Sequence, residues 1–270
     1  MLATAPLWLI FLLSIALFGV ASEIGHRIGV ESEREANVVT LQASVLGLLA
    51  LMMSFTFAMS VAHFDQRREA TLGEANAIGT AALRARLLPP PLGAESLDLL
   101  QNYVAIRTEL AHSLVTPASR DAAIARSNEL HEGLWRVVQE AVRKDSAMVP
   151  TGFFIQALNE LVDSHERRLT AFRRRVPPTV FIALYGIATL GIGFSGYASG
   201  LDRKRWRLPV YLVNILVASV TLLIQDIDRP DVGSVQVSTQ PLIDAAESLS
   251  SYSRAGGSTP EPAQQTAPAR

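Results

Sequence analysis

Side chains able to do chemistry are few in this sequence, and they are scattered. The five histidines do not cluster, and the chain has no cysteine, which excludes thiolate metal sites, cysteine nucleophiles and disulfides. The sequence also lacks the motifs typical of nucleotide binding, acyl transfer by a serine nucleophile and zinc-dependent hydrolysis. We therefore expect no catalytic residues and no enzymatic activity.

The histidines are expected to have structural roles. His112 and His131 lie in polar helical stretches, and His26 and His63 lie near the ends of apolar segments, where a histidine is typical of a surface or boundary residue. His165 alone belongs to an otherwise apolar stripe. A core histidine bonded to a polar neighbour explains that position better than a metal ligand does.

Composition narrows the class of protein. Hydrophobic residues make up 49% of the chain and charged residues 18%, with a formal net charge of −1. The hydrophobic share is higher than a soluble domain of this size normally carries, yet the charged residues leave room for an aqueous part. A nucleic-acid-binding protein would show an excess of Lys and Arg, so we expect no nucleic-acid partner.

Four stretches without a charged side chain are long enough to cross a bilayer, since a helix rises about 1.5 Å per residue and the hydrocarbon layer is roughly 30 Å thick. They are residues 1–22, 36–62, 176–201 and 208–225. The first also resembles a cleaved signal peptide, but no basic residue precedes its apolar run, so a retained helix is expected. The sequence predicts a protein embedded in a lipid bilayer.

The region between the second and third stretches has its apolar residues at helical spacing. Its breaks fall at prolines, above all at the three in a row over 89–91, which no helix interior accepts. Four helices are expected there, over 61–88, 96–114, 119–144 and from about 150 to 172. The predicted fold class is an all-α integral membrane protein, with four transmembrane helices and a helical aqueous domain between the second and third.

Several short segments carry a resemblance to a known family. They are FDQRR at 64–68, EANAIGTA at 74–81, RLLP at 86–89, ALNELVDSHERRLTAF at 157–172, and DRP at 228–230 followed by QP at 240–241. Together they resemble the bacterial bestrophin-like family. For bestrophins the resemblance implies four spanning helices, a helical cytoplasmic region between the second and third, and a fivefold anion channel whose second helices line the pore through a hydrophobic neck.

The resemblance assigns the second spanning helix to the pore, because FTFAMSVAHFDQRREA at 55–70 is similar to the end of the bestrophin pore helix. Residues three or four apart share a face of a helix, and large apolar rings at a constriction gate by excluding water. On this basis the candidate neck residues are Leu48, Met52, Phe55 and Met59.

Arg67 and Arg68 follow the candidate neck and are candidates for the aqueous mouth of the pore, where they would meet inorganic anions. The alternative for both is a solvated helix face or contact with lipid phosphates. The resemblance also implies a homo-oligomer, with a pentamer as the expected form.

An acidic turn follows the fourth span. Animal bestrophins bind calcium in an acidic clasp near the membrane, so the resemblance makes Asp226, Asp228 and Asp231 weak candidates for a calcium site. Their spacing does not match a calcium-binding loop, and Arg229 lies among them as a counter-charge. The alternative is that Arg229 and Pro230 end the fourth helix while the carboxylates meet basic residues of the aqueous domain, with no cofactor bound.

Small residues in the third span predict close helix packing. Gly193, Gly196 and Gly200 leave little side chain between helices, and the last two form a G-x-x-x-G pair. This packing could lie within one subunit or between subunits. Asn214, in the middle of the fourth span, is expected to hydrogen-bond across helices.

The expected organisation has five parts. They are the first two spans over 1–62, a helical cytoplasmic domain over 63–177, the last two spans over 178–225, a membrane-proximal segment over 226–249 and a disordered tail over 250–270, rich in Gly, Ser and Pro. Basic residues near the membrane slightly favour a cytoplasmic middle domain and C-terminus in a bacterial inner membrane. The alternative function is a membrane sensor or scaffold whose helical domain binds a partner or small molecule.

Overall fold

The computed structural model describes residues 6–32, 37–112, 116–144, 149–202, 207–230 and 233–257. These residues form α1 (Leu7–Glu31), α2 (Val38–Ala85), α3 (Leu92–His112), α4 (Pro117–Lys144), α5 (Val149–Arg173), α6 (Pro178–Leu201), α7 (Leu208–Asp228) and α8 (Gln240–Gly257). Four stretches of helix are long and apolar enough to cross a membrane, and the described parts of the chain contain no strand. The predicted all-α membrane fold is confirmed.

The chain forms two compact units. Residues 1–67 and 171–237 make up the first, which we call the membrane unit and which contains α1, the first part of α2, α6 and α7. Residues 68–170 and 238–270 make up the second, which we call the aqueous unit and which contains the rest of α2, α3, α4, most of α5, and α8.

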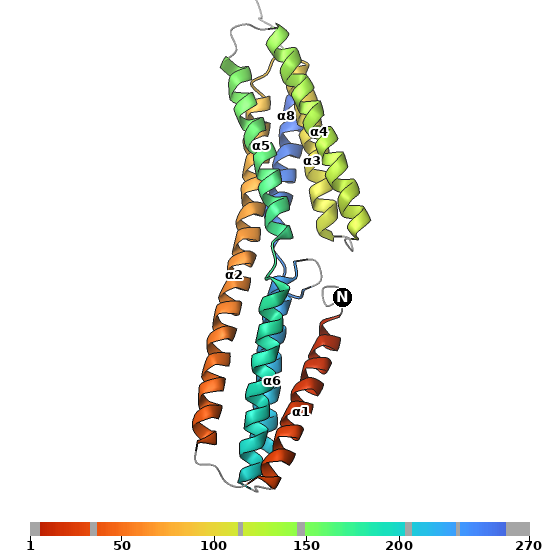
Figure 1. Ribbon diagram of the computed structural model, residues 1–270. Helices are drawn as coiled ribbons and strands as arrows, with labels where there is room; N and C mark the ends of the chain where they lie inside the picture. The colour runs from red at the N-terminus through yellow and green to blue at the C-terminus, as the bar shows by residue number, and fades with distance from the viewer. Residues whose placement is uncertain are drawn as a thin grey trace, which may run out of the picture. The chain divides into compact units, whose positions relative to one another are not determined.

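In the membrane unit, α1 lies along α6, and glycines on both helices let the two backbones nearly touch (Figure 1). A Cβ atom added at Gly25 or Gly29 would fall within 3.0 Å of the α6 backbone, and one added at Gly196 or Gly200 within 3.0 Å of the α1 backbone. Gly193 lies in the same contact, with its carbonyl beside Gly25. The close packing predicted for the glycines of this span therefore occurs within one chain, with α1 as the partner.

Polar side chains also connect the spans of the membrane unit. Tyr185 of α6 shares a hydrogen bond of 2.8 Å with the hydroxyl of Ser14 of α1, and it accepts one of 3.0 Å from the amide of Gln225 of α7. Asn214 is buried in α7, but neither its amide nitrogen nor its amide oxygen has a hydrogen-bond partner among the described residues. The hydrogen bond across helices that was expected of Asn214 is not found there.

The aqueous unit has an apolar core to which all five of its helices contribute. The helix α8 takes part through Leu242, Ala245 and Leu249, whose spacing of three and four residues puts them on one face. It lies beside α3, and it was not predicted from the sequence. Because α8 extends to Gly257, the prediction of a disordered tail from residue 250 is wrong for its first part, and residues 258–270 lie outside the described residues.

Candidate functional site

The membrane half of α2 is the most open of the spanning helices. Only 17% of the residues in its most apolar stretch are buried, less than in any other span. Among the candidate neck residues, Phe55 is 63% exposed, Leu48 48% and Met59 38%, whereas Met52 is partly buried and packs against the core of the membrane unit. An apolar stripe of this helix is therefore left uncovered by its own chain.

The buried side of the same helix carries small polar residues. Thr56 and Ser60 are fully enclosed, and the Thr56 hydroxyl donates a hydrogen bond of 2.7 Å to the carbonyl of Met52. Leu49 joins the apolar core on this side. The covered side of α2 thus combines apolar residues with two small polar ones, whereas Leu48, Phe55 and Met59 remain on the open side.

The two candidate mouth arginines lie in different surroundings. Arg67 is 1% exposed and donates hydrogen bonds to the carbonyls of Ile227, at 2.6 Å, and Asp228, at 3.3 Å. These are the last carbonyls of α7, which have no partner within the helix and favour a cation nearby. The structure places Arg67 at the end of α7 rather than on an open aqueous surface, while Arg68 is exposed. The spacing of residues within α2 could not predict that the end of α7 lies beside Arg67.

The carboxylates after α7 are bound to the chain itself. Asp228 accepts a hydrogen bond of 2.9 Å from the backbone N–H of Val176, and Asp226 accepts bonds from the backbone and the hydroxyl of Ser234. In the described ranges no group of three or more His, Cys, Asp or Glu could hold a metal ion. Asp226 and Asp228 thus each accept hydrogen bonds from another segment of the chain, and Asp231 lies outside the described residues.

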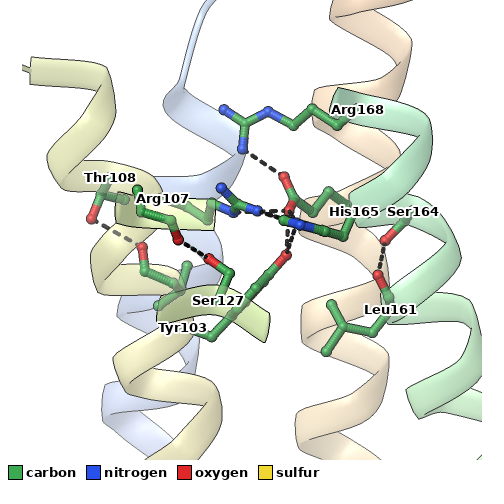
Figure 2. Close-up of polar contacts among 11 residues, drawn as sticks. Tyr103, Arg107, Thr108, Ser127, Leu161, Ser164, His165 and Arg168 are labelled. Carbon is green, nitrogen blue, oxygen red and sulfur yellow. Dashed lines mark hydrogen bonds and ion pairs between the residues drawn. The ribbon is translucent and has the colours of Figure 1, made fainter. Parts of the chain in front are cut away.

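A fully buried carboxylate lies inside the aqueous unit. It belongs to Glu74 of α2, which is 0% exposed. Side chains from three further helices surround it, and Figure 2 shows those of Tyr103, Arg107, His165 and Arg168 turned toward a common centre. We call the whole group the Glu74 cluster: Glu74, Tyr103 and Arg107 of α3, His131 of α4, and His165 and Arg168 of α5.

Both oxygens of the Glu74 carboxylate have charged or polar partners. Arg168 donates a hydrogen bond of 2.6 Å to Oε2, and Tyr103 donates one of 2.5 Å to Oε1. Arg107 places its Nε atom 3.2 Å from the same Oε1, and His165 places Nδ1 at 3.5 Å. A carboxylate can be kept ionised in a protein core only with such partners.

Burial and neighbouring groups shift the pKa values of three residues of the cluster, Glu74, Tyr103 and His131. Burial favours the protonated form of Glu74, but the His165 hydrogen bond and the charges of Arg168 and Arg107 outweigh it, so the pKa of Glu74 lies well below its usual range. Burial, and then the charge of Glu74, raise the pKa of Tyr103, so the phenol stays protonated. Burial, and then repulsion by His165 and Arg107, lower the pKa of His131 to about 4. At neutral pH the folded chain holds His131 uncharged.

One residue of this cluster was predicted from the sequence to be a core residue. His165 is 1% exposed and lies 3.0 Å from the Tyr103 hydroxyl, as expected of a core histidine with a polar neighbour. The prediction of a surface position for His131 is wrong, because this residue is 7% exposed and its ring stacks edge to face on that of His165. Glu74 was missed, although it continues the buried stripe of Ile78 and Ala81 at helical spacing.

These observations define an all-helical membrane protein of several spans with a helical aqueous unit between two of them. A family model of the bestrophin-like domain matches residues 8–242, and the chain belongs to the bestrophin-like family. No curated protein sequence matches the chain.

Solved structures of low sequence identity share the fold. A bacterial bestrophin homologue from Klebsiella pneumoniae is 15% identical with a TM-score of 0.64, over 91% of this chain and 98% of that one. A point variant of the Klebsiella homologue gives a TM-score of 0.66 at 13% identity, over 92% and 97% of the two chains. A structure described as a membrane protein variant gives 0.67 at 13% identity, over 93% and 100%. Identities this low support the fold alone.

Proposed function

We propose that the chain assembles into an oligomeric anion channel whose hydrophobic neck is formed by the membrane half of α2. The observation that carries the proposal is the apolar stripe of Leu48, Phe55 and Met59, which its own chain leaves open. Copies arranged around an axis cover such a stripe with one another. A ring of large apolar side chains at the axis then excludes water and gates conduction.

The pentamer expected from the family fits this arrangement, with one α2 from each copy at the centre. Arg68 is exposed and follows the apolar stripe on α2, so we assign it to the aqueous mouth of the proposed pore. An exposed guanidinium raises the local concentration of anions. Arg67 is not assigned this role because its guanidinium donates a hydrogen bond to the carbonyl of Ile227 at the end of α7.

The proposal places the channel in a bacterial inner membrane with the aqueous unit and the C-terminus in the cytoplasm. Because the chain has no cysteine, single cysteines test this orientation directly. Glu129 of α4 and Asp202 after α6 are both exposed. A membrane-impermeant thiol reagent should label Asp202→Cys in intact cells and Glu129→Cys only after the cells are opened, and the reverse pattern would overturn the orientation.

Chloride flux into liposomes tests the conduction itself. Replacement of Phe55 with Ala should raise flux several-fold, because a smaller apolar ring holds water more easily. Phe57→Ala is the matched control, since a residue two positions away points to the other side of the helix. The control should leave the flux unchanged.

The oligomeric state completes the test of the channel. Native mass measurement in mild detergent should give an oligomer for wild type and for both variants. A monomer, or the absence of flux from wild type and from Phe55→Ala at high protein load, would refute the channel. The chain would then be better described as a membrane scaffold or sensor.

A further inference from the structure

The stretch of chain over residues 167–201 carries positive charge and no carboxylate. It contains five arginines and neither Asp nor Glu. Three of them, Arg173, Arg174 and Arg175, are consecutive and exposed, and they connect the last turn of α5 to the start of α6. Because α6 is apolar and long enough to cross a membrane, this junction lies where the chain enters the lipid.

Hydrogen bonds to two other spans hold the junction in place. Arg174 donates one of 3.1 Å to the side-chain oxygen of Gln66 in α2, and the backbone N–H of Val176 donates one of 2.9 Å to Oδ1 of Asp228 at the end of α7. The bond to Gln66 uses one of the five N–H donors of a guanidinium group. The junction therefore presents its arginines from a fixed position beside the ends of α2 and α7.

The carboxylates of the membrane unit near this junction already have donors. Asp226 accepts hydrogen bonds from Ser234, and Asp228 accepts one from Val176 and also interacts with the charge of Arg175. Arg173 and Arg174 are the other exposed cations of the junction, and they outnumber the one exposed carboxylate beside Gln66, that of Asp65. An anionic group is the ligand that this charge favours.

An open apolar surface continues from the junction along α6. Ile182 is 70% exposed and lies one turn past the start of the helix, and Leu190 is 62% exposed. Gly186 lies midway between them on the same face, with open space at the position of its missing Cβ atom. An acyl chain can lie along these three residues and fill the space at the glycine.

We propose that the junction between α5 and α6 binds an anionic phospholipid, whose phosphate accepts hydrogen bonds from Arg173 and Arg174 and whose acyl chain lies along Ile182, Gly186 and Leu190. Guanidinium groups match phosphate with paired hydrogen bonds, and basic residues next to a span attract anionic headgroups. This inference is independent of whether the chain conducts ions, because none of the five residues belongs to the proposed neck or mouth.

Lipid titration of the full-length chain in a neutral detergent tests the site. Native mass spectra should show phosphatidylglycerol binding about tenfold or more tightly than phosphatidylcholine with the same acyl chains, because one arginine near a membrane surface contributes about fivefold in affinity for anionic lipid. Equal binding of the two lipids would overturn the proposal.

Arginine variants locate the site. The double variant of Arg173→Gln and Arg174→Gln should bind phosphatidylglycerol about tenfold more weakly than wild type. The matched control combines Arg136→Gln and Arg143→Gln, two exposed arginines of α4, and it changes the net charge equally. The control should bind as wild type does. A double variant that binds like wild type, or a control that loses as much affinity, would refute the site.

The unfolding midpoint without added lipid shows whether each variant is folded. If the double variant is not folded, Arg173→Gln alone should lower the affinity for phosphatidylglycerol about threefold or more, since Arg174 keeps its bond to Gln66. An unchanged affinity in this single variant would then refute the site.

Inorganic phosphate distinguishes a lipid from a free anion as the ligand. Phosphate offers the same oxygens to the two arginines but has no acyl chain to lie on α6. At millimolar concentration in constant ionic strength, it should leave the phosphatidylglycerol bound. Displacement of the lipid by phosphate would assign the junction to free anions and overturn the proposal.

Discussion

The two units of this chain are both bundles of helices, but different contacts hold them together. In the membrane unit, Gly25 and Gly29 of α1 meet Gly196 and Gly200 of α6 with almost no side chain between the helices. In the aqueous unit, larger apolar side chains lie between the helices together with alanines, and the buried carboxylate of Glu74 connects α2 to α3 and α5.

This contrast follows from the solvent around each unit. Lipid tails are as apolar as leucine, so burying leucine gains little in a membrane, and helices associate there by close van der Waals contact. In water the burial of apolar area drives packing, and a core can then also hold an ionic cluster whose charges are neutralised by partners. The stability of the membrane unit should therefore fall when side-chain volume is added at the glycine contact. The stability of the aqueous unit should fall when a buried charge is removed.

The largest effect is expected from removing the charge of Glu74. Glu74→Gln keeps the shape of the side chain but removes the negative charge that Arg107 and Arg168 contact, and loss of one partner from a buried ion pair costs about 3–5 kcal/mol. The unfolding midpoint of the chain in mild detergent should fall sharply. Glu160→Gln is the control, because Glu160 pairs with Arg167 at an exposed position, where an ion pair contributes about 1 kcal/mol or less. Equal midpoints for the two variants would show that the cluster does not hold the unit together.

A smaller effect is expected from adding one methyl group to the glycine contact. In Gly196→Ala the new Cβ meets the backbone carbonyl of Ser22, which cannot rotate away, so α1 and α6 must separate. Overpacking of this kind costs about 1–3 kcal/mol. Gly186→Ala, on the same helix but with open space around its Cβ position, should leave the unfolding midpoint unchanged. If both variants behaved alike, close approach of the backbones would not be what stabilises this contact.

The smallest effect is expected where α2 meets the end of α7. Arg67→Lys keeps the positive charge but cannot reproduce both bonds to the carbonyls of Ile227 and Asp228, and one lost hydrogen bond costs about 1 kcal/mol. Thermal unfolding should show a small decrease in midpoint, and Arg68→Lys, at an exposed position, should show none. A larger loss in Arg68→Lys than in Arg67→Lys would contradict the role assigned to the buried arginine.

The sequence was sufficient to predict the features that depend on local pattern. The four spans follow from apolar length, and α3, α4 and α5 follow from helical spacing and from prolines between them. The helix α8 was not predicted although Leu242, Ala245 and Leu249 have the same spacing, because the polar composition after Ser250 is typical of a disordered tail. The signal for α8 was present in the sequence.

The sequence was not sufficient for features that depend on contacts between distant segments. The partners of Glu74 come from α3 and α5, and no local pattern in α2 specifies them. The burial of Arg67 likewise depends on the end of α7, which lies about 160 residues further along the chain. A charged residue on an otherwise apolar stripe, as at Glu74 and Arg107, is the one local sign of such a cluster.

The position of α8 has a consequence for how the protein is made. The core of the aqueous unit needs Leu242 and Leu249, but the ribosome reaches them only after both α6 and α7 have been synthesised. At roughly 5–20 residues per second, the helices α3, α4 and α5 wait several seconds for their last partner. A chain interrupted after α7 would leave the apolar side chains that α8 covers exposed to chaperones and proteases.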